Sequence, residues 1–231
     1  MLTAPQNQAQ RLGFLREKIT AAARAAGRDP GAVTLIGVAK SQPLPRLLAA
    51  VDGGLADIAE NYLQEGREHI AALAGRAITW HFIGALQSNK TRPVAELFDW
   101  VHTVDRQRIA ERLAEQRPRD RLPLAVCIQV RLGGEAAKSG VEPGELGALA
   151  GQIAALPRLA LRGLMTLPPE EPDVKRQRHW FRELRRLMLQ LNDAGHRLDV
   201  LSMGMSADFE SAVAEGATHL RIGSALFGER V

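Results

Sequence analysis

Disulfide bonds, membrane spans and a secretory leader all lack support in this sequence. Its one cysteine, Cys127, cannot form an internal disulfide, which is typical of a protein from a reducing compartment. No run approaches the roughly 20 apolar residues of a membrane span, and the longest candidate, 122–130, is only strand-sized. Residues 1–10 lack the basic and apolar regions of a signal peptide. We therefore expect a cytoplasmic protein with no membrane partner.

Lysine is also scarce, although the chain as a whole is basic. Lys and Arg total 30 against 26 Asp and Glu, which gives a net charge of +4. A charge this small over 231 residues indicates solubility rather than nucleic-acid binding. The chain has only five lysines: Lys18, Lys40, Lys90, Lys138 and Lys175. Chemistry that needs an amine therefore has few candidates.

What the sequence does contain is an alternation of apolar runs and amphipathic segments. The apolar runs cover 33–39, 55–60, 79–84, 100–104, 124–130, 159–167, 198–203 and 219–227. The helical patterns between them cover 44–52, 62–74, 88–97, 106–117, 142–155, 173–194 and 207–215, and a further helix lies within 1–30. Continuous apolar runs separated by helices predict parallel strands covered on both faces.

This alternation predicts an α/β fold, a single (β/α)8 TIM barrel with an extra N-terminal helix. We expect residues 1–231 to form one domain, with residues 1–30 packed on the barrel. A doubly wound open sheet is the alternative, although no GxGxxG motif follows the first apolar run.

Lys40 is the most informative single residue, because it directly follows a strongly apolar strand. Working residues of such barrels lie at the carboxyl ends of the strands. Burial there favours the neutral amine, which can form a Schiff base with a carbonyl compound. The alternative is a structural lysine that extends to solvent or pairs with Glu60.

Two turns near the C-terminus form a second candidate site. The loops after strands 7 and 8 of such barrels frequently bind phosphate. Ser206 is placed to cap the predicted helix 207–215, Gly223 allows close approach of the backbone, and Ser224 adds a hydroxyl. The alternative is ordinary turn chemistry, in which Asp208 satisfies the helix dipole.

Arg221 lies two residues before Gly223 and shares its face of the strand. An inward arginine needs a carboxylate, a phosphate or a ring nitrogen as its partner, and an internal ion pair is equally compatible. An amine and a phosphate site across one barrel mouth define a phosphorylated aldehyde or ketone as ligand. Pyridoxal phosphate and an aldolase sugar phosphate both fit this description.

Several longer strings are more specific than these single residues. They are VAK (38–40), ENYLQEG (60–66), WHFIGALQSNK (80–90), HTVDR (102–106), KSG (138–140), RGLMTL (162–167), LSMGMSADFESAVAEG (201–216) and RIGSALFG (221–228). Together they resemble the pyridoxal-phosphate homeostasis protein family, formerly the proline synthetase co-transcribed bacterial homologue proteins. The resemblance covers about 200 residues and implies a barrel like the N-terminal domain of alanine racemase.

The resemblance implies a role for each matching residue. It makes Lys40 the lysine that holds pyridoxal 5'-phosphate as a covalent internal aldimine. The other implied cofactor-binding residues are Ser206, Gly223 and Ser224 at the phosphate, Arg221 at the pyridine nitrogen, Asn61 and Met165 lining the cofactor, and His81 at the same mouth. Ala59 departs from the family, which usually has glycine there, and one added methyl is expected to change little.

The resemblance also implies a carrier and regulator of the vitamin B6 cofactor rather than an enzyme. An arginine opposite the pyridine nitrogen weakens the electron sink used in carbanion chemistry. We also expect no catalytic residues, because nothing after Val231 could build the second domain that supplies an opposing base in racemases. A racemase-like enzyme that uses pyridoxal phosphate is the alternative. The expected partners are the cofactor and apo-forms of enzymes that use it, and the expected state is a monomer.

The segment 173–194 is rich in arginine and raises a third possibility, a basic surface for a nucleic acid or another partner. Phe181, Leu184, Met188 and Leu191 form an apolar stripe on it, which predicts that the arginines are a solvated face. We therefore expect no nucleic-acid partner. No histidine spacing indicates a metal site.

Overall fold

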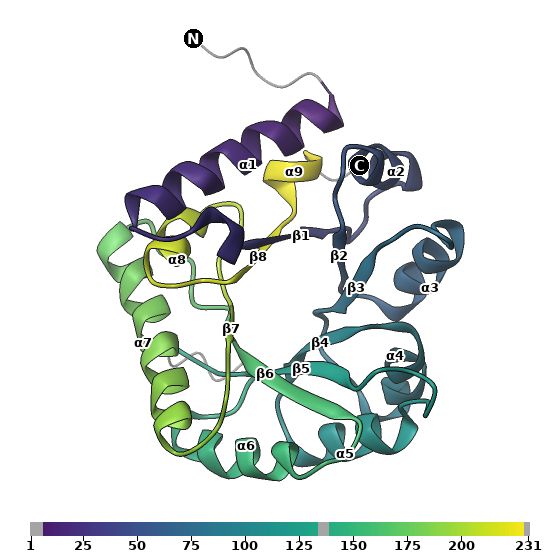
Figure 1. Cartoon of the computed structure of the whole chain (residues 1–231), viewed down its shortest axis with the longest axis vertical. Coiled ribbons are helices and arrows are strands. Elements are labelled where there is room, and N and C mark those ends of the chain that lie inside the picture. The colour runs from purple at the N-terminus through teal and green to yellow at the C-terminus, as the bar shows by residue number, and fades with distance from the viewer. Residues whose placement is uncertain (1–6, 134–138, 229–231) are drawn as a thin grey trace.

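The strands form a closed parallel barrel in which each strand pairs with its neighbours in sequence, and β1 pairs with β8 (Figure 1). The computed structural model describes residues 7–133 and 139–228; Lys138, and with it the start of the KSG string, lies outside them. The strands are β1 (Thr34–Val38), β2 (Asp57–Glu60), β3 (Thr79–Phe82), β4 (Trp100–Val104), β5 (Leu124–Gln129), β6 (Leu159–Met165), β7 (Val200–Ser202) and β8 (His219–Ile222). The barrel predicted from the sequence is confirmed, and the open-sheet alternative is excluded.

Helices surround the barrel and link successive strands (Figure 1). They are α1 (Gln8–Ala25), α2 (Leu44–Asp52), α3 (Leu63–Ala72), α4 (Thr91–Leu97), α5 (Gln107–Gln116), α6 (Leu146–Ala154), α7 (Val174–Asp193), α8 (Phe209–Ala214) and α9 (Ser224–Phe227). Short 3-10 turns η1 (Pro30–Ala32), η2 (Ser88–Lys90) and η3 (Pro143–Glu145) precede β1, α4 and α6. Within the described residues, no helix is long and apolar enough to cross a membrane.

The core lies mainly between the strands and the surrounding helices. Every residue of β5 is buried, as expected for a strand covered on both faces. The helix α1 begins after Asn7, whose side chain accepts a hydrogen bond from the Gln10 N–H. Its buried residues are Leu12, Leu15, Ile19 and Ala23, and it packs against α2, α8 and α9. The extra N-terminal helix therefore covers the side of the barrel where the chain closes.

Two element boundaries correct the sequence predictions. The apolar run 219–227 is not one strand, because the chain turns at Gly223 and continues as the short helix α9. The helix predicted over 207–215 begins only at Phe209, with Asp208 as its N-cap residue. Ser206 therefore lies in the loop before α8 and not at its cap.

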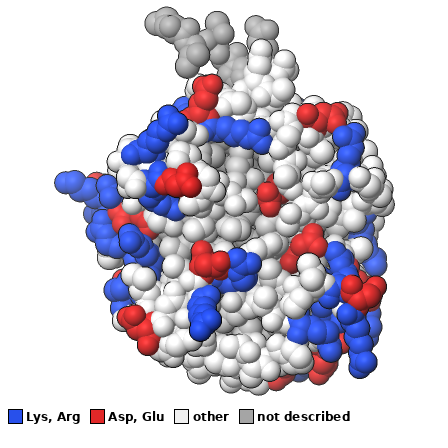
Figure 2. Space-filling view, viewed as in Figure 1, with Lys and Arg blue, Asp and Glu red and all other residues white. Residues whose placement is uncertain are grey.

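The apolar stripe of α7 faces the core as predicted: Phe181, Leu184 and Leu191 are buried. Its arginines lie on the outer side, where Lys and Arg side chains are interspersed with Asp and Glu (Figure 2). Arg178 and Arg182 both bind Glu215, with N···O distances of 2.7 and 2.8 Å.

Candidate functional site

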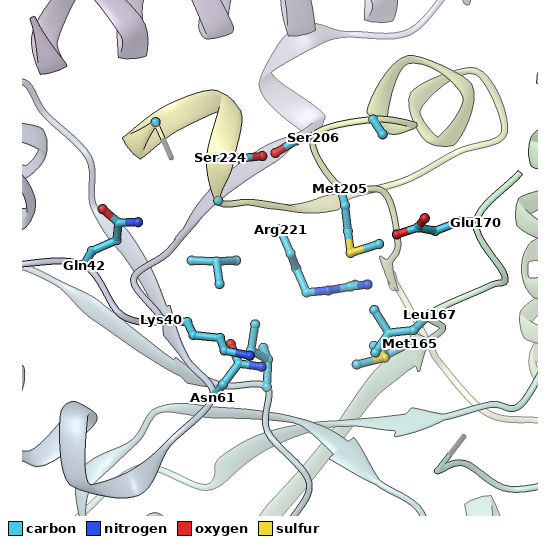
Figure 3. Close-up of a pocket in the computed structure, with 15 residues that line it drawn as sticks. Lys40, Gln42, Asn61, Met165, Leu167, Glu170, Met205, Ser206, Arg221 and Ser224 are labelled. Atoms are coloured by element: carbon cyan, nitrogen blue, oxygen red, sulfur yellow. The ribbon is translucent and has the colours of Figure 1, made fainter. Parts of the chain in front are cut away.

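A cavity of about 650 Å³ opens at the carboxyl ends of the strands (Figure 3). The residues predicted from the sequence that line it are Lys40, Asn61, Met165, Ser206, Arg221, Gly223 and Ser224. Lys40 and Asn61 enter it from one side, Ser206 and Ser224 lie at the opposite side, and Arg221 extends between them (Figure 3). Side chains from the two ends of the chain meet here because the barrel closes through β1 and β8.

Lys40 follows the end of β1 and is half-buried at the cavity wall. The next residue, Ser41, has a φ of 55°, a left-handed conformation that is uncommon for a non-glycine residue. Its N–H donates to Glu65 Oε2 on α3 at 2.8 Å, which holds the turn after the lysine. The Lys40 Nζ lies 5.1 Å from the centre of the Tyr62 ring, a cation–π contact.

Glu60 does not pair with Lys40, so the pairing considered from the sequence is excluded. Its side chain is fully buried, and Oε1 lies 2.6 Å from His69 Nδ1 on α3. Burial raises the pKa of Glu60, and the hydrogen bond to Glu60 raises the pKa of His69. No ion pair of Lys40 occurs within residues 7–133 and 139–228, so its amine is available to a ligand.

Asn61 is fixed by a close approach of two backbone segments. A Cβ at Gly84 would lie 1.9 Å from the Asn61 carbonyl oxygen, so only glycine fits there. The Asn61 side-chain oxygen is buried and has no hydrogen-bond partner among the described residues. Such a group in a cavity wall indicates that a ligand supplies the partner.

Ser206 and Ser224 present hydroxyl groups side by side at the far end of the cavity (Figure 3). Ser206 Oγ accepts a hydrogen bond from the Ala225 N–H in α9 at 3.1 Å. The capping role predicted for Ser206 at 207–215 is therefore wrong. Asp208 instead accepts from the Met205 N–H at 2.6 Å, which stabilises the loop before α8.

Arg221 extends from β8 into the barrel and is only 3% exposed. Its guanidinium donates to Ser202 Oγ at 2.7 Å and to the Thr166 carbonyl at 2.9 Å. Burial lowers its pKa to about 10. The internal ion pair considered from the sequence does not occur within the described residues, so the charge faces the cavity without a carboxylate partner.

His81 is the predicted site residue that the structure does not bring to the cavity. It is fully buried inside the barrel, where Nε2 lies 3.1 Å from Asp57 Oδ1 and Nδ1 lies 2.9 Å from His102 Nε2. The reason is its position within β3, one residue before the strand ends, with its side chain directed into the barrel. The prediction that His81 lies at the mouth is corrected accordingly.

The cavity also has lining residues that sequence reasoning missed. They are Val38, Gln42, Ile83, Leu167, Glu170, Met205, Ala207 and Gly228. Most of them follow a strand end, so the same rule that selected Lys40 could have found them. Glu170 is the charged residue among them, and its carboxylate lies beside Met205 at the cavity edge (Figure 3).

Comparison with known proteins defines the class first. Residues 12–231 match the family model described as "Alanine racemase, N-terminal domain". The chain therefore belongs to the class of proteins built on the alanine racemase N-terminal barrel, and Lys40 lies just after the first strand of that barrel.

Individual relatives narrow the class. The chain is 51% identical over 222 residues to the pyridoxal phosphate homeostasis protein of Pseudomonas aeruginosa, covering 96% of this chain and 95% of that protein. It is 48% identical over 225 residues to the protein of the same name from Vibrio cholerae, covering 96% and 95%. PipY of Synechococcus elongatus, solved with pyridoxal phosphate bound, matches with a TM-score of 0.86 and 36% identity, covering 96% and 100%. The chain belongs to the pyridoxal phosphate homeostasis protein family.

Proposed function

We propose that this protein binds pyridoxal 5'-phosphate through Lys40 and serves in homeostasis of the cofactor, without efficient catalysis. The observation that carries the proposal is the placement of Lys40. Its amine has no ion pair among the described residues, and it faces a cavity whose far end offers the Ser206 and Ser224 hydroxyls. The cofactor-binding unit in this proposal is the barrel with α1 packed on it.

The cavity residues fit the chemical groups of the cofactor one by one. Lys40 would take the aldehyde, and Ser206 and Ser224, with the backbone at Gly223, would hold the phosphate. Arg221 would face the ring nitrogen, since its buried guanidinium has no carboxylate partner among the described residues. Asn61 would use its unpartnered side chain in the cavity wall.

The bond in this proposal is an imine between the lysine and the cofactor, which supplies an electrophilic aldehyde when it is bound. The Lys40 nitrogen would form a C=N bond with the aldehyde carbon, and the carbonyl oxygen would leave as water with the two hydrogens of the amine. The reaction consumes nothing but the two partners and is reversible by hydrolysis. A reversible bond suits a protein that stores a reactive aldehyde and later releases it.

Arg221 favours storage over catalysis in this proposal. A guanidinium that faces the ring nitrogen as a donor leaves that nitrogen unprotonated, which weakens the electron sink needed for carbanion chemistry. The relatives named as homeostasis proteins support a role in homeostasis, and the PipY structure with bound cofactor supports cofactor binding. We further propose that the bound cofactor is passed to apo-forms of enzymes that use it.

Reductive trapping tests the covalent site. The wild-type protein mixed with pyridoxal phosphate should develop an imine absorbance near the visible range, and borohydride followed by peptide mass analysis should place the label on Lys40. Lys40→Ala should lose the absorbance and the label. Lys90→Ala, which removes an exposed lysine, should retain both. A wild-type protein that stays colourless, or a K40A variant that is labelled equally, would contradict the proposal.

A second experiment separates a cofactor store from a racemase-like enzyme. The loaded protein in deuterated water should not exchange the α-hydrogen of amino acids at a useful rate, and it should activate an apo-enzyme by giving up its cofactor. Rapid deuterium exchange across a panel of amino acids would favour the racemase-like alternative instead.

A further inference from the structure

A continuous row of hydrogen bonds crosses the barrel interior below the cavity. We propose that Asp57, His81, His102 and Ser202 form a positioning relay that holds the Arg221 guanidinium toward the ring nitrogen of the cofactor. The part that concerns the cofactor rests on the function proposed above. The relay itself is a property of the chain alone.

The geometry of the relay is continuous from one end of the barrel to the other. Arg221 Nη1 lies 2.7 Å from Ser202 Oγ, and the same oxygen lies 2.7 Å from His102 Nδ1. His102 Nε2 then lies 2.9 Å from His81 Nδ1, and His81 Nε2 lies 3.1 Å from Asp57 Oδ1. Asp57 begins β2 at the amino end of the strands, opposite the cavity, and its side chain is 24% exposed.

The donors along this row can run in only one direction without adding a buried charge. Arg221 can only donate, so Ser202 accepts from it and can donate its own hydrogen to His102 Nδ1. The His102 proton is then on Nε2 and is donated to His81 Nδ1. His81 in turn carries its proton on Nε2 and donates to the Asp57 carboxylate. In the reverse direction, an unprotonated His81 Nε2 would face the Asp57 carboxylate, or His81 would have to carry a proton on both nitrogens and a positive charge.

This polarity links two opposite charges through neutral groups. The buried Arg221 has no carboxylate within hydrogen-bond distance among the described residues, and the relay ends on the negative charge of Asp57. Hydrogen bonds in series polarise one another in a low-dielectric interior, so each strengthens the next. Burial, with the neighbouring His81, His219 and Arg221, holds the pKa of His102 well below its usual range, which keeps the imidazole neutral.

The groups packed around the relay support the same protonation state. Trp100 of β4 stacks on His81, with ring centres 5.7 Å apart. The other ionisable groups that face the relay or Arg221 are His219 on β8, Arg162 on β6 with its partner Asp199, Cys127 on β5, and Asp208 before α8. The positive charge of Arg221 disfavours protonation of His102, and the positive charge of Arg162 disfavours protonation of His219.

Nitrogen NMR of the histidine rings tests the relay in the protein without cofactor. His81 and His102 should both be neutral with the proton on Nε2. Ser202→Ala should shift the Nδ1 resonance of His102, because it removes the hydroxyl that this nitrogen accepts from, and Ser202→Thr, which keeps the hydroxyl, should restore it. Thr103→Val is the matched control, because it removes a buried hydroxyl that binds the Gly84 carbonyl outside the relay. A His102 protonated on Nδ1, or an unchanged S202A spectrum, would overturn the relay.

Asp57→Ala tests the far end and keeps the proposal testable if S202A does not fold. Asp57 is partly exposed and lies across the barrel from the cavity, so a merely local role would leave the cofactor unaffected. With ring-labelled pyridoxal phosphate bound, the protonation midpoint of the ring nitrogen should rise by about one pH unit, a tenfold change in proton affinity, in D57A and S202A. T103V should match the wild type.

The outcomes separate this proposal from the function it rests on. If the wild type binds the cofactor but D57A and S202A leave the ring nitrogen unchanged, the relay does not position Arg221, and the proposed function stands. If no variant and no wild type binds the cofactor, the proposed function fails. The positioning role toward the cofactor then fails with it, while the histidine spectra alone decide whether the relay exists.

Discussion

At the scale of single residues, the most unusual feature is a group of imidazoles in the barrel interior. The ring centres of His102 and His219 are 6.1 Å apart, and those of His81 and His102 are 5.2 Å apart. Burial, reinforced by the positive charge that His81 would carry if protonated, lowers the pKa of His219 to about 4. His102 and His219 are therefore neutral in the folded protein at pH values where an exposed histidine is already charged.

This gives a pH-dependence of stability with a definite sign. An unfolded histidine binds a proton below about pH 6.5, whereas folded His219 resists it until about pH 4, so its contribution is complete above pH 6.5 and is lost as the pH falls between these values. The contribution is at most about 3 kcal/mol. His219→Gln should therefore reduce the loss of unfolding free energy between pH 6.5 and pH 4, measured by urea denaturation.

The control for this measurement is His179→Gln, which changes an exposed histidine. His69 acts with the opposite sign, since its pKa is raised and its contribution is lost as the pH rises. It is unchanged in both variants, so their difference isolates His219. Equal slopes for H219Q and H179Q would refute the argument.

The residue scale also shows where sequence reasoning works and where it stops. Lys40 could be found because a strand end is readable from hydrophobicity, and the barrel rule then places that end at the cavity. The partner of Ser206 could not be found, because the Ala225 N–H lies 19 residues away and meets it only through the pairing of β7 with β8. His81 was misplaced for a similar reason, since its depth within the barrel depends on strand tilt and register.

At the scale of elements, hydrophobic patterning predicted the strands and helices more reliably than their ends. The bounds of α2 and β4 agree with the predicted ranges 44–52 and 100–104. The predicted strand 219–227 failed because its second half, SALF, is as apolar as a strand but forms α9. Periodicity over so few residues cannot separate a buried turn of helix from a strand.

Alanine substitutions at Gly163 in β6 and at Gly151 in α6 should change the unfolding free energy in opposite directions. A Cβ at Gly163 in β6 would lie 1.8 Å from the Val200 carbonyl oxygen on β7, so Gly163→Ala must push the two strands apart. Gly151 in α6 has nothing within 4 Å of the added atom and is exposed. We expect Gly163→Ala to lower the unfolding free energy by about 2 kcal/mol or more, and Gly151→Ala to raise it by about 0.5–1 kcal/mol.

Denaturant unfolding of both variants measures these changes directly. Each substitution adds one methyl group, so the pair controls for composition and hydrophobicity. A stabilised G163A would show that β6 and β7 are not packed as closely as described. A destabilised G151A would show that α6 has a contact at this position that the structure lacks.

At the scale of the whole molecule, closure of the barrel assembles the site. Lys40 follows β1 and Arg221 belongs to β8, and these strands are paired from Thr34 with His219 to Gly37 with Ile222. No local segment contains both ends of the cavity, so a ligand that bridges them binds only the folded chain. The sequence predicted this meeting through the count of strands, whereas the shape of the cavity between them required the structure.

A ligand that binds only the folded chain must stabilise the whole molecule, and the phosphate should account for much of that effect. At a concentration of about 100 times Kd the stabilisation is about 2.7 kcal/mol, which corresponds to a rise in Tm of roughly 5–10 °C for a chain of this size.

Pyridoxal, which has the aldehyde but lacks the phosphate, should raise Tm much less at the same concentration. Ser224→Ala, at an exposed position, should narrow the difference between the two compounds, because it removes a hydroxyl at the phosphate end. Lys40→Ala should lower the effect of both compounds, since it removes the group that takes the aldehyde. Equal shifts from pyridoxal and pyridoxal phosphate in the wild type would show that Ser206, Gly223 and Ser224 do not hold the phosphate, and differential scanning fluorimetry can decide this with the four combinations of compound and serine variant.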